Sequence, residues 1–189
     1  MDHAEVMQVM QHSHAYQEGH FRLAGGRHTN RYVQCAHVTQ NAAVTEKVCR
    51  ALTEKCSNRS FDLVVSPALG GMILGYEMSR ILGIHYVYTE RRDGAMTLRR
   101  GFSISKGAHV LIVEDVVTTG GSVREVMEIV RAFGGEVEQV ACLVDRSNGK
   151  VDLGVPFTSL ISYEVETWPE TNCPLCSQGI PITKPAGRD

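Results

Sequence analysis

Two adjacent carboxylates and a hydroxyl-rich glycine turn are the residues of this chain best suited to chemistry. Glu114 and Asp115 follow an apolar run over 110–113 that is typical of a buried parallel strand. Residues 118–122, Thr-Thr-Gly-Gly-Ser, come next and lead into a helical pattern over 123–130. Backbone N–H groups and hydroxyls at a helix N-terminus can hold a phosphate, and carboxylates can accept hydrogen bonds from ribose hydroxyls. The segment therefore predicts a sugar-phosphate or nucleotide site.

The plainer explanation of this segment is that it ends a strand and caps a helix, since both features are common. Two carboxylates directly after four apolar residues, followed by hydroxyls and glycines, are a much rarer combination and favour the site. The segment also resembles the signature of type I phosphoribosyltransferases, which bind phosphoribosyl pyrophosphate (PRPP), and its form is most similar to the orotate branch. The resemblance implies a catalytic role for Asp115 and PRPP contacts by Glu114, Asp115, Val116, Val117, Thr118, Thr119, Gly120, Gly121 and Ser122.

A second turn over 66–71, Ser-Pro-Ala-Leu-Gly-Gly, also lies between a strand pattern and a helix pattern. Gly70 and Gly71 allow backbone N–H groups to approach an anion closely. On spacing alone, an ordinary strand-to-helix turn is slightly the better explanation. The position of the turn resembles the pyrophosphate-binding loop of phosphoribosyltransferases, which implies PRPP contacts by Ala68, Leu69 and Gly70.

The segment 90–105 concentrates positive charge around a glycine at position 94. Arginines on a mobile segment can clamp a polyanion and neutralise the charge of a leaving group. A solvated hairpin is otherwise the better explanation of such charges. The segment resembles the catalytic hood loop of orotate phosphoribosyltransferases, although Ala95 and Thr97 replace the usual lysine and histidine. We expect a catalytic residue among four arginines, and poor order without substrate because they repel one another: Arg91, Arg92, Arg99 and Arg100.

Candidates for binding a base lie in three separate parts of the chain. Arg146 resembles the arginine of a family Asp-Arg pair that grips the orotate carboxylate, for which a forked donor is well suited. An ion pair with Asp145 is the alternative. Thr118 also matches a base-contacting position. The stretch 21–27 resembles a segment that lines the base pocket, with Ala24 in place of a frequent PRPP-binding lysine, and Tyr32 could stack on the base or belong to the core.

The remaining pattern predicts the fold. Helices are expected over about 1–17 and 42–56, followed by strands and helices in alternation over 63–66, 70–82, 84–88, 110–113, 121–133 and 137–144. Such alternation predicts an α/β protein with a central, mostly parallel sheet and helices on both faces. We expect one phosphoribosyltransferase domain with a small N-terminal hood (about 1–40), a core (about 41–165) and an irregular tail (about 166–189). Both carboxylates and Arg146 would lie at the carboxyl edge of the sheet.

Composition limits the classes of function. The chain has 189 residues and a net charge of −2, which fits one domain and gives no electrostatic footprint for nucleic acid. No apolar run approaches the roughly 20 residues of a membrane span, and the N-terminus lacks the features of a secretory signal. We therefore expect a cytoplasmic protein without membrane or nucleic-acid partners.

The six cysteines include one pair, Cys173 and Cys176, with the spacing of half a zinc site. In a cytoplasmic protein we expect the cysteines to be reduced thiols. A structural zinc usually needs four ligands, and the sequence contains no second Cys-x-x-Cys. Zinc binding is therefore not expected unless two subunits share the ligands.

The resemblance covers about residues 21–149 and implies an orotate phosphoribosyltransferase. Orotate and PRPP would give orotidine 5′-monophosphate and pyrophosphate, with Mg²⁺ held mainly by PRPP rather than by protein ligands. The family also implies a homodimer whose hood loop reaches the partner's site. Two alternatives remain open. A purine phosphoribosyltransferase would not need an arginine at 146, and a PRPP-sensing regulator would need a nucleic-acid surface that the sequence does not show.

Overall fold

The structure is a computed structural model that describes the whole chain except residues 24, 57 and 184–189. Its centre is a six-stranded sheet with the order β5-β4-β3-β6-β7-β8. Five strands are parallel, and β5 alone pairs antiparallel, with β4. The strands are β3 (Leu63–Pro67), β4 (His85–Arg92), β5 (Ala95–Leu98), β6 (His109–Val117), β7 (Glu136–Asp145) and β8 (Phe157–Ser162). The predicted mostly parallel α/β sheet is confirmed.

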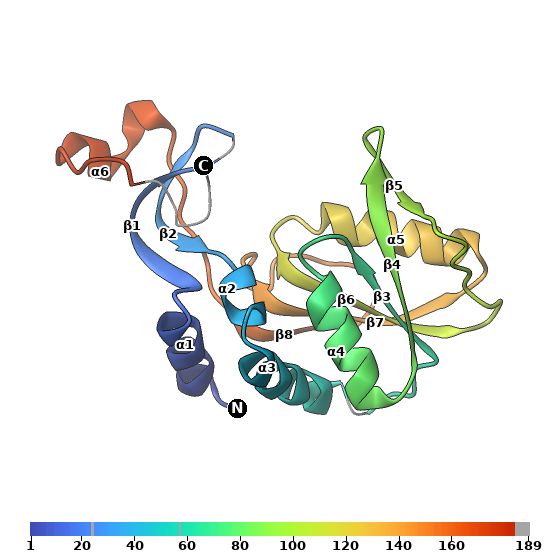
Figure 1. Ribbon diagram of the computed structural model, residues 1–189. Helices are drawn as coiled ribbons and strands as arrows, with labels where there is room; N and C mark the ends of the chain where they lie inside the picture. Colours follow the sequence, from blue (N-terminus) through green and yellow to red (C-terminus); the bar gives the residue numbers. More distant parts are fainter. Residues whose placement is uncertain (24, 57, 184–189) are drawn as a thin grey trace.

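Helices cover both faces of this sheet (Figure 1). Helices α3 (Ala42–Lys55) and α4 (Met72–Leu82) pack on one face, and α5 (Gly121–Ala132) packs on the other. Alternation along β6 accounts for the two layers, since successive strand side chains point to opposite faces. Leu111 and Val113 belong to the core beneath α3 and α4, whereas Val110 and Ile112 belong to the core beneath α5.

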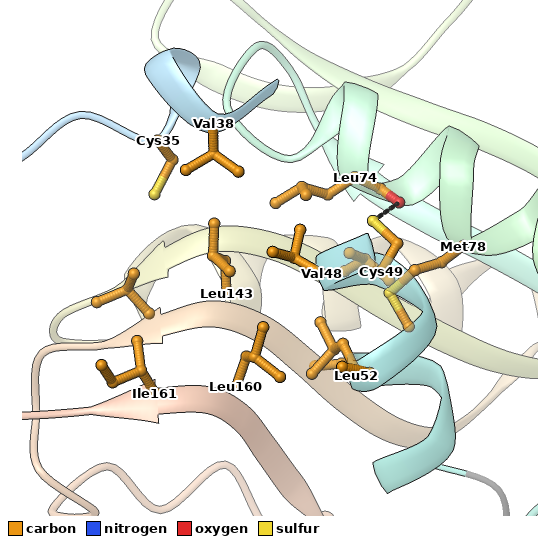
Figure 2. Packing of buried hydrophobic residues seen from close by; sticks show 14 of the residues in the cluster. Cys35, Val38, Val48, Cys49, Leu52, Leu74, Met78, Leu143, Leu160 and Ile161 are labelled. Carbon is orange, nitrogen blue, oxygen red and sulfur yellow. Dashed lines mark hydrogen bonds between the residues drawn. The ribbon is translucent and has the colours of Figure 1, made fainter. Parts of the chain in front are cut away.

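Figure 2 shows the larger core, in which two helices meet the sheet through side chains spaced four residues apart. Val48 and Leu52 of α3 and Leu74 and Met78 of α4 are each at most 1 % exposed, as is Leu143 of β7. Residues at i and i+4 share one helix face, so each helix presents a continuous apolar stripe. Burial of each such side chain contributes about 1.5–3 kcal/mol.

The two ends of the chain together form the hood, which lies beside the core (Figure 1). Its N-terminal part contains α1 (His3–His12), the antiparallel strands β1 (Tyr16–Arg22) and β2 (His28–Val33), and α2 (Ala36–Thr39). Its C-terminal part contains the 3-10 helix η1 (Glu170–Asn172) and α6 (Pro174–Ser177). A two-way backbone bridge joins the parts, because His28 N donates to Trp168 O at 2.7 Å and Trp168 N donates to His28 O at 2.9 Å.

Several elements differ from their predicted bounds. The first helix ends at His12, and 16–22 form a strand because β2 supplies a pairing partner. Strand β6 continues through both carboxylates to Val117, since β7 extends the ladder as far as the pair Val117–Asp145. Strands β5 and β8 were not predicted. No helix in the described part of the chain has the length and apolar character that a membrane span requires.

Candidate active site

The predicted site lies where the strand order reverses. Strands β3 and β6 are parallel neighbours, but the chain leads from β3 to β4 on one side and from β6 to β7 on the other. The connecting helices α4 and α5 therefore lie on opposite faces of the sheet. In open α/β sheets, this reversal leaves a crevice at the carboxyl ends of the two strands.

The turn over 118–122 lines a cavity of about 270 Å³ at this crevice, together with Glu114 and Glu125. Gly120 has a φ of +77°, which side chains of L-residues rarely adopt, so the turn needs glycine there. Arg124 braces the turn by donating to Thr119 O at 2.7 Å and to Asp152 O at 2.6 Å. No side chain caps α5, so its first N–H groups can serve an anion.

The two glycine turns predicted from sequence meet each other in space. A Cβ on Gly70 would lie 2.5 Å from Asp115 Oδ1, and a Cβ on Gly71 would lie 2.6 Å from Val113 O. The backbone of the 66–71 turn therefore lies directly against the carboxylates that end β6. Ala68 N anchors this turn to Thr89 O at 2.7 Å, and the Ala68–Leu69 peptide is cis.

The two carboxylates differ in burial. Glu114 is 7 % exposed, and its Oε1 accepts a hydrogen bond from Asp115 N at 2.9 Å. Burial, followed by the neighbouring Asp115 charge, raises the pKa of Glu114 to about 9. Asp115 is half-buried, and its Oδ1 accepts from Val116 N at 2.8 Å. Near neutral pH Glu114 is therefore protonated and can donate a hydrogen bond.

Comparison with known families agrees with this geometry. Residues 36–177 match the family model described as the phosphoribosyl transferase domain. The chain belongs to the phosphoribosyltransferase family. A protein of Heliobacterium modesticaldum named orotate phosphoribosyltransferase is 51 % identical to it, with 100 % of both chains covered. A protein of Desulforamulus reducens with the same name is 48 % identical, with 100 % of this chain and 98 % of the relative covered.

Solved phosphoribosyltransferase structures share the fold. The orotate phosphoribosyltransferase of Mycobacterium tuberculosis in complex with inorganic phosphate has a TM-score of 0.68 and 23 % identity, covering 85 % of this chain and 95 % of its own. The adenine phosphoribosyltransferase of Leishmania tarentolae has a TM-score of 0.65 and 19 % identity, covering 86 % of this chain and 89 % of its own. The structures of an orotate and an adenine phosphoribosyltransferase therefore match this chain about equally well, so the fold alone does not identify the base.

The predicted hood loop of this phosphoribosyltransferase forms a β-hairpin, β4–β5, that projects beyond the sheet (Figure 1). Its turn lies at Asp93 and Gly94, which both have positive φ. The expected mutual repulsion of the arginines is wrong, because carboxylates pair with all of them. The pairs are Arg91–Glu125 at 2.7 Å, Arg92–Asp93 at 3.5 Å, Arg99–Glu90 at 3.3 Å and Arg100–Glu90 at 3.2 Å. Poor order of the loop in the substrate-free enzyme stays a prediction.

The guanidinium of Arg146 is not paired with Asp145, the alternative that the sequence left open. Asp145 instead accepts hydrogen bonds from the backbone and hydroxyl of Ser147 and from Gly149 N, at 2.6–2.8 Å, and from Ser162 Oγ at 3.0 Å. Burial alone would raise the pKa of Asp145, but these hydrogen bonds hold it below its ordinary value. Arg146 Nε is buried without a hydrogen-bond partner among the described residues.

Two residues that the sequence did not single out lie near Arg146. Arg31 Nε and Tyr163 Oη are also buried and lack a hydrogen-bond partner within the described chain. Burial raises the pKa of Tyr163, and the charges of Arg146 and Arg31 act in the opposite direction. Tyr163 N donates to Asp145 O at 3.0 Å, which places Tyr163 beside the end of β7. Tyr163 follows β8, which was not predicted, so its proximity could not be foreseen. Tyr32 is 8 % exposed and packs on Phe21, and Ala24 lies outside the described residues.

The contact between the two glycine turns predicts a steric effect. Gly71→Ala should lower the free energy of unfolding by about 1–3 kcal/mol, because its Cβ would meet the rigid carbonyl of Val113. Gly25→Ala is the matched control, since nothing lies within 4 Å of a Cβ there. Urea unfolding of both variants measures the effect. Equal stability of the two variants would contradict the close packing of the turns.

Burial of Glu114 predicts a pH effect on the substrate-free enzyme. Its folded pKa of about 9 exceeds the ordinary value of 4.5, so the folded state binds more protons between these values and stability falls as pH rises. Glu114→Gln removes the titration and should unfold at a progressively higher temperature than wild type from about pH 5 to about pH 9. A difference in unfolding temperature that does not change with pH would show that Glu114 is not held protonated.

Proposed function

We propose that this enzyme transfers the ribose 5-phosphate group of PRPP to orotate, giving orotidine 5′-monophosphate and pyrophosphate in pyrimidine synthesis. The observation that carries the proposal is the buried Arg146 Nε, which has no hydrogen-bond partner among the described residues, beside the 118–122 turn. Arg146 N donates to Val117 O at 2.8 Å, which places the backbone of Arg146 beside the start of the 118–122 turn. Together with Arg31 and Tyr163 it offers donors that suit a planar carboxylate, which orotate has and purine bases lack.

The arrangement divides the substrate among separate elements. The 118–122 turn and the start of α5 would bind the 5′-phosphate. Glu114 and Asp115 would bind the ribose hydroxyls, and Ala68, Leu69 and Gly70 would present backbone to the pyrophosphate. Arg146, Thr118 and Tyr32 would contact the base. The transfer passes through a cationic sugar, as glycoside cleavage does, so the negative charge of Asp115 stabilises the transition state.

Mg²⁺ belongs to the proposal as a ligand of PRPP. Oxygen ligands and water suit this ion, and Asp115 is the half-buried carboxylate that the site offers beside the protonated Glu114. The described residues offer too few ligands at this site for a dedicated cage, which fits an ion held mainly by pyrophosphate oxygens. When bound, the ion would neutralise charge on the departing pyrophosphate.

The arginine hairpin would close over the pyrophosphate and exclude water from the sugar cation. Arg91 is the strongest candidate for the catalytic arginine, because its ion-pair partner, Glu125, lies outside the hairpin. The pair is exposed, and exposed ion pairs contribute little to stability, so Arg91 can exchange Glu125 for the pyrophosphate. The same proposal includes a homodimer in which the hairpin serves the partner's site.

Arg91→Ala should lower turnover on the order of 10–100-fold and change the dissociation constant of PRPP much less, because leaving-group charge grows in the transition state. Steady-state kinetics and calorimetric binding separate the two effects, with Arg50→Ala, which removes an exposed arginine of α3, as the control. Mixing Arg91→Ala with Asp115→Asn protein tests the dimer, since only a hairpin acting across the interface regenerates an intact site. Normal turnover in all four single arginine variants would contradict the role of the hairpin.

An ultraviolet assay tests the substrate directly. PRPP consumption is measured with orotate, uracil, hypoxanthine and adenine under the same conditions. We expect turnover with orotate and none with uracil, hypoxanthine or adenine. Preference for a purine would favour the purine alternative, and PRPP binding without turnover of any base would favour the PRPP-sensing alternative.

A further inference from the structure

Four side chains with metal-binding atoms meet in the hood, away from the 118–122 turn. They are His20 of β1, His28 of β2, Cys173, and Cys176 of α6, and their ligand atoms all lie within 4.8 Å of one another. The cysteines are more than 140 positions from the histidines, so tertiary folding brings the two pairs together. His20, His28 and Cys173 are at most 3 % exposed, whereas Cys176 is exposed.

The distances between these atoms suit a tetrahedral ion. The sulfur–nitrogen distances are 3.6 Å for Cys173–His20, 3.7 Å for Cys176–His20 and 3.3 Å for Cys176–His28. Zinc bonds of about 2.3 Å to sulfur and about 2.0 Å to nitrogen place such atoms about 3.5 Å apart in a tetrahedron. His20 Nε2 and His28 Nδ1 are closer, at 2.8 Å, which is the distance of a hydrogen bond between the rings. If the two rings moved slightly further apart, the ion would fit between them.

The orientation of His20 is that of a metal ligand. Its Nδ1 lies 2.7 Å from Ile180 O, and a carbonyl can only accept, so Nδ1 carries the proton. This tautomer leaves the Nε2 lone pair directed at the two thiols and the other ring. A histidine that binds a metal commonly donates its second N–H to a backbone carbonyl in this way.

We propose that His20, His28, Cys173 and Cys176 form a structural zinc site. Two sulfurs and two imidazole nitrogens favour zinc over the hard cations, and four protein ligands leave no open position for catalysis. On binding, the two thiols become thiolates and release their protons to solvent. The sequence expectation that zinc would need ligands from a second subunit is wrong, because two histidines of the same chain complete the set.

The site would fasten the C-terminal tail to the hood. Four residues beyond Cys176, Ile180 supplies the carbonyl that orients His20, and Thr183 N donates to His20 O. His20 adjoins Phe21, on which Tyr32 packs. Zinc would therefore hold the strands that carry two proposed contacts of the base pocket, Arg31 and Tyr32.

Metal analysis of the purified full-length protein tests the proposal. Protein prepared without chelators should contain about one zinc ion per chain. The double variant Cys173→Ser, Cys176→Ser should retain less than about a tenth of it, and Cys56→Ala, which changes a buried cysteine outside the cluster, should retain all of it. Removal of zinc should also speed tryptic cleavage between β1 and β2, where Arg22 and Arg27 lie.

A second measurement on the wild-type protein covers the case in which the double variant fails to fold. Cobalt exchanged for zinc should give the intense visible absorption of a tetrahedral ion together with thiolate-to-metal charge transfer. Wild-type protein without stoichiometric metal, or cobalt spectra without thiolate bands, would overturn the site. Cysteines 173 and 176 that react with a thiol reagent only after reduction would show a disulfide instead, which also overturns it. None of these readouts depends on orotate being the substrate.

Discussion

Replacing Asp115 by asparagine is expected to lower turnover on the order of 100-fold, the typical cost of removing one preorganised electrostatic contact. The change keeps the shape of the side chain and its hydrogen bond from Val116 N, but it removes the negative charge that we propose lies nearest the ribose. Burial, the largest cause of the raised pKa of Glu114, is unchanged in this variant, so Glu114 does not replace that charge. The measurement is the rate constant of orotate consumption at saturating PRPP.

The matched control is Glu136→Gln, which removes an exposed carboxylate at the opposite end of the sheet, where β7 begins. It should leave turnover and PRPP affinity near wild type. An Asp115→Asn enzyme with wild-type turnover and PRPP affinity would remove Asp115 from the site. An Asp115→Asn enzyme that loses activity only because it unfolds would show a lowered unfolding temperature, which circular dichroism detects.

Arg146→Ala should raise the Michaelis constant for orotate on the order of 100-fold and change that for PRPP far less. The physical reason is that the guanidinium has a buried Nε without a partner within the described chain, so a substrate carboxylate would gain a charge-assisted contact there. The 118–122 turn does not depend on the Arg146 side chain, because hydrogen bonds from Arg124 hold the turn in place. Initial rates over a matrix of both substrates separate the two constants.

Two further variants make this experiment specific. Arg131→Ala removes an exposed arginine in the last turn of α5 and should leave both constants unchanged. Arg146→Lys retains the charge but loses the planar fork, so an intermediate Michaelis constant for orotate is expected. Unchanged use of orotate by the Arg146→Ala enzyme would contradict the assignment of the base, even if the phosphoribosyl transfer itself is confirmed.

The sequence by itself determined the parts of this enzyme that are contiguous in the chain. The apolar run of β6, the two carboxylates after it and the Thr-Thr-Gly-Gly-Ser turn are adjacent residues, so local rules were enough to predict a strand, a phosphate turn and a helix. Alternation of such units also determined the parallel sheet, because right-handed crossovers leave few other topologies. The carboxyl edge of the sheet then followed as the location of the crevice.

Only the tertiary structure decided which distant residues meet. Pairing of β1 with β2 and of the tail with His28 brings His20 and His28 to the cysteine pair, although no local pattern links them. Strand β8 likewise carries Tyr163 to Arg146, and α5 presents Glu125 to Arg91. These contacts depend on strand order and on the docking of the tail, which no short window of sequence encodes. Side-chain spacing along the chain predicts one face of one element, whereas a site built across elements depends on how they pack.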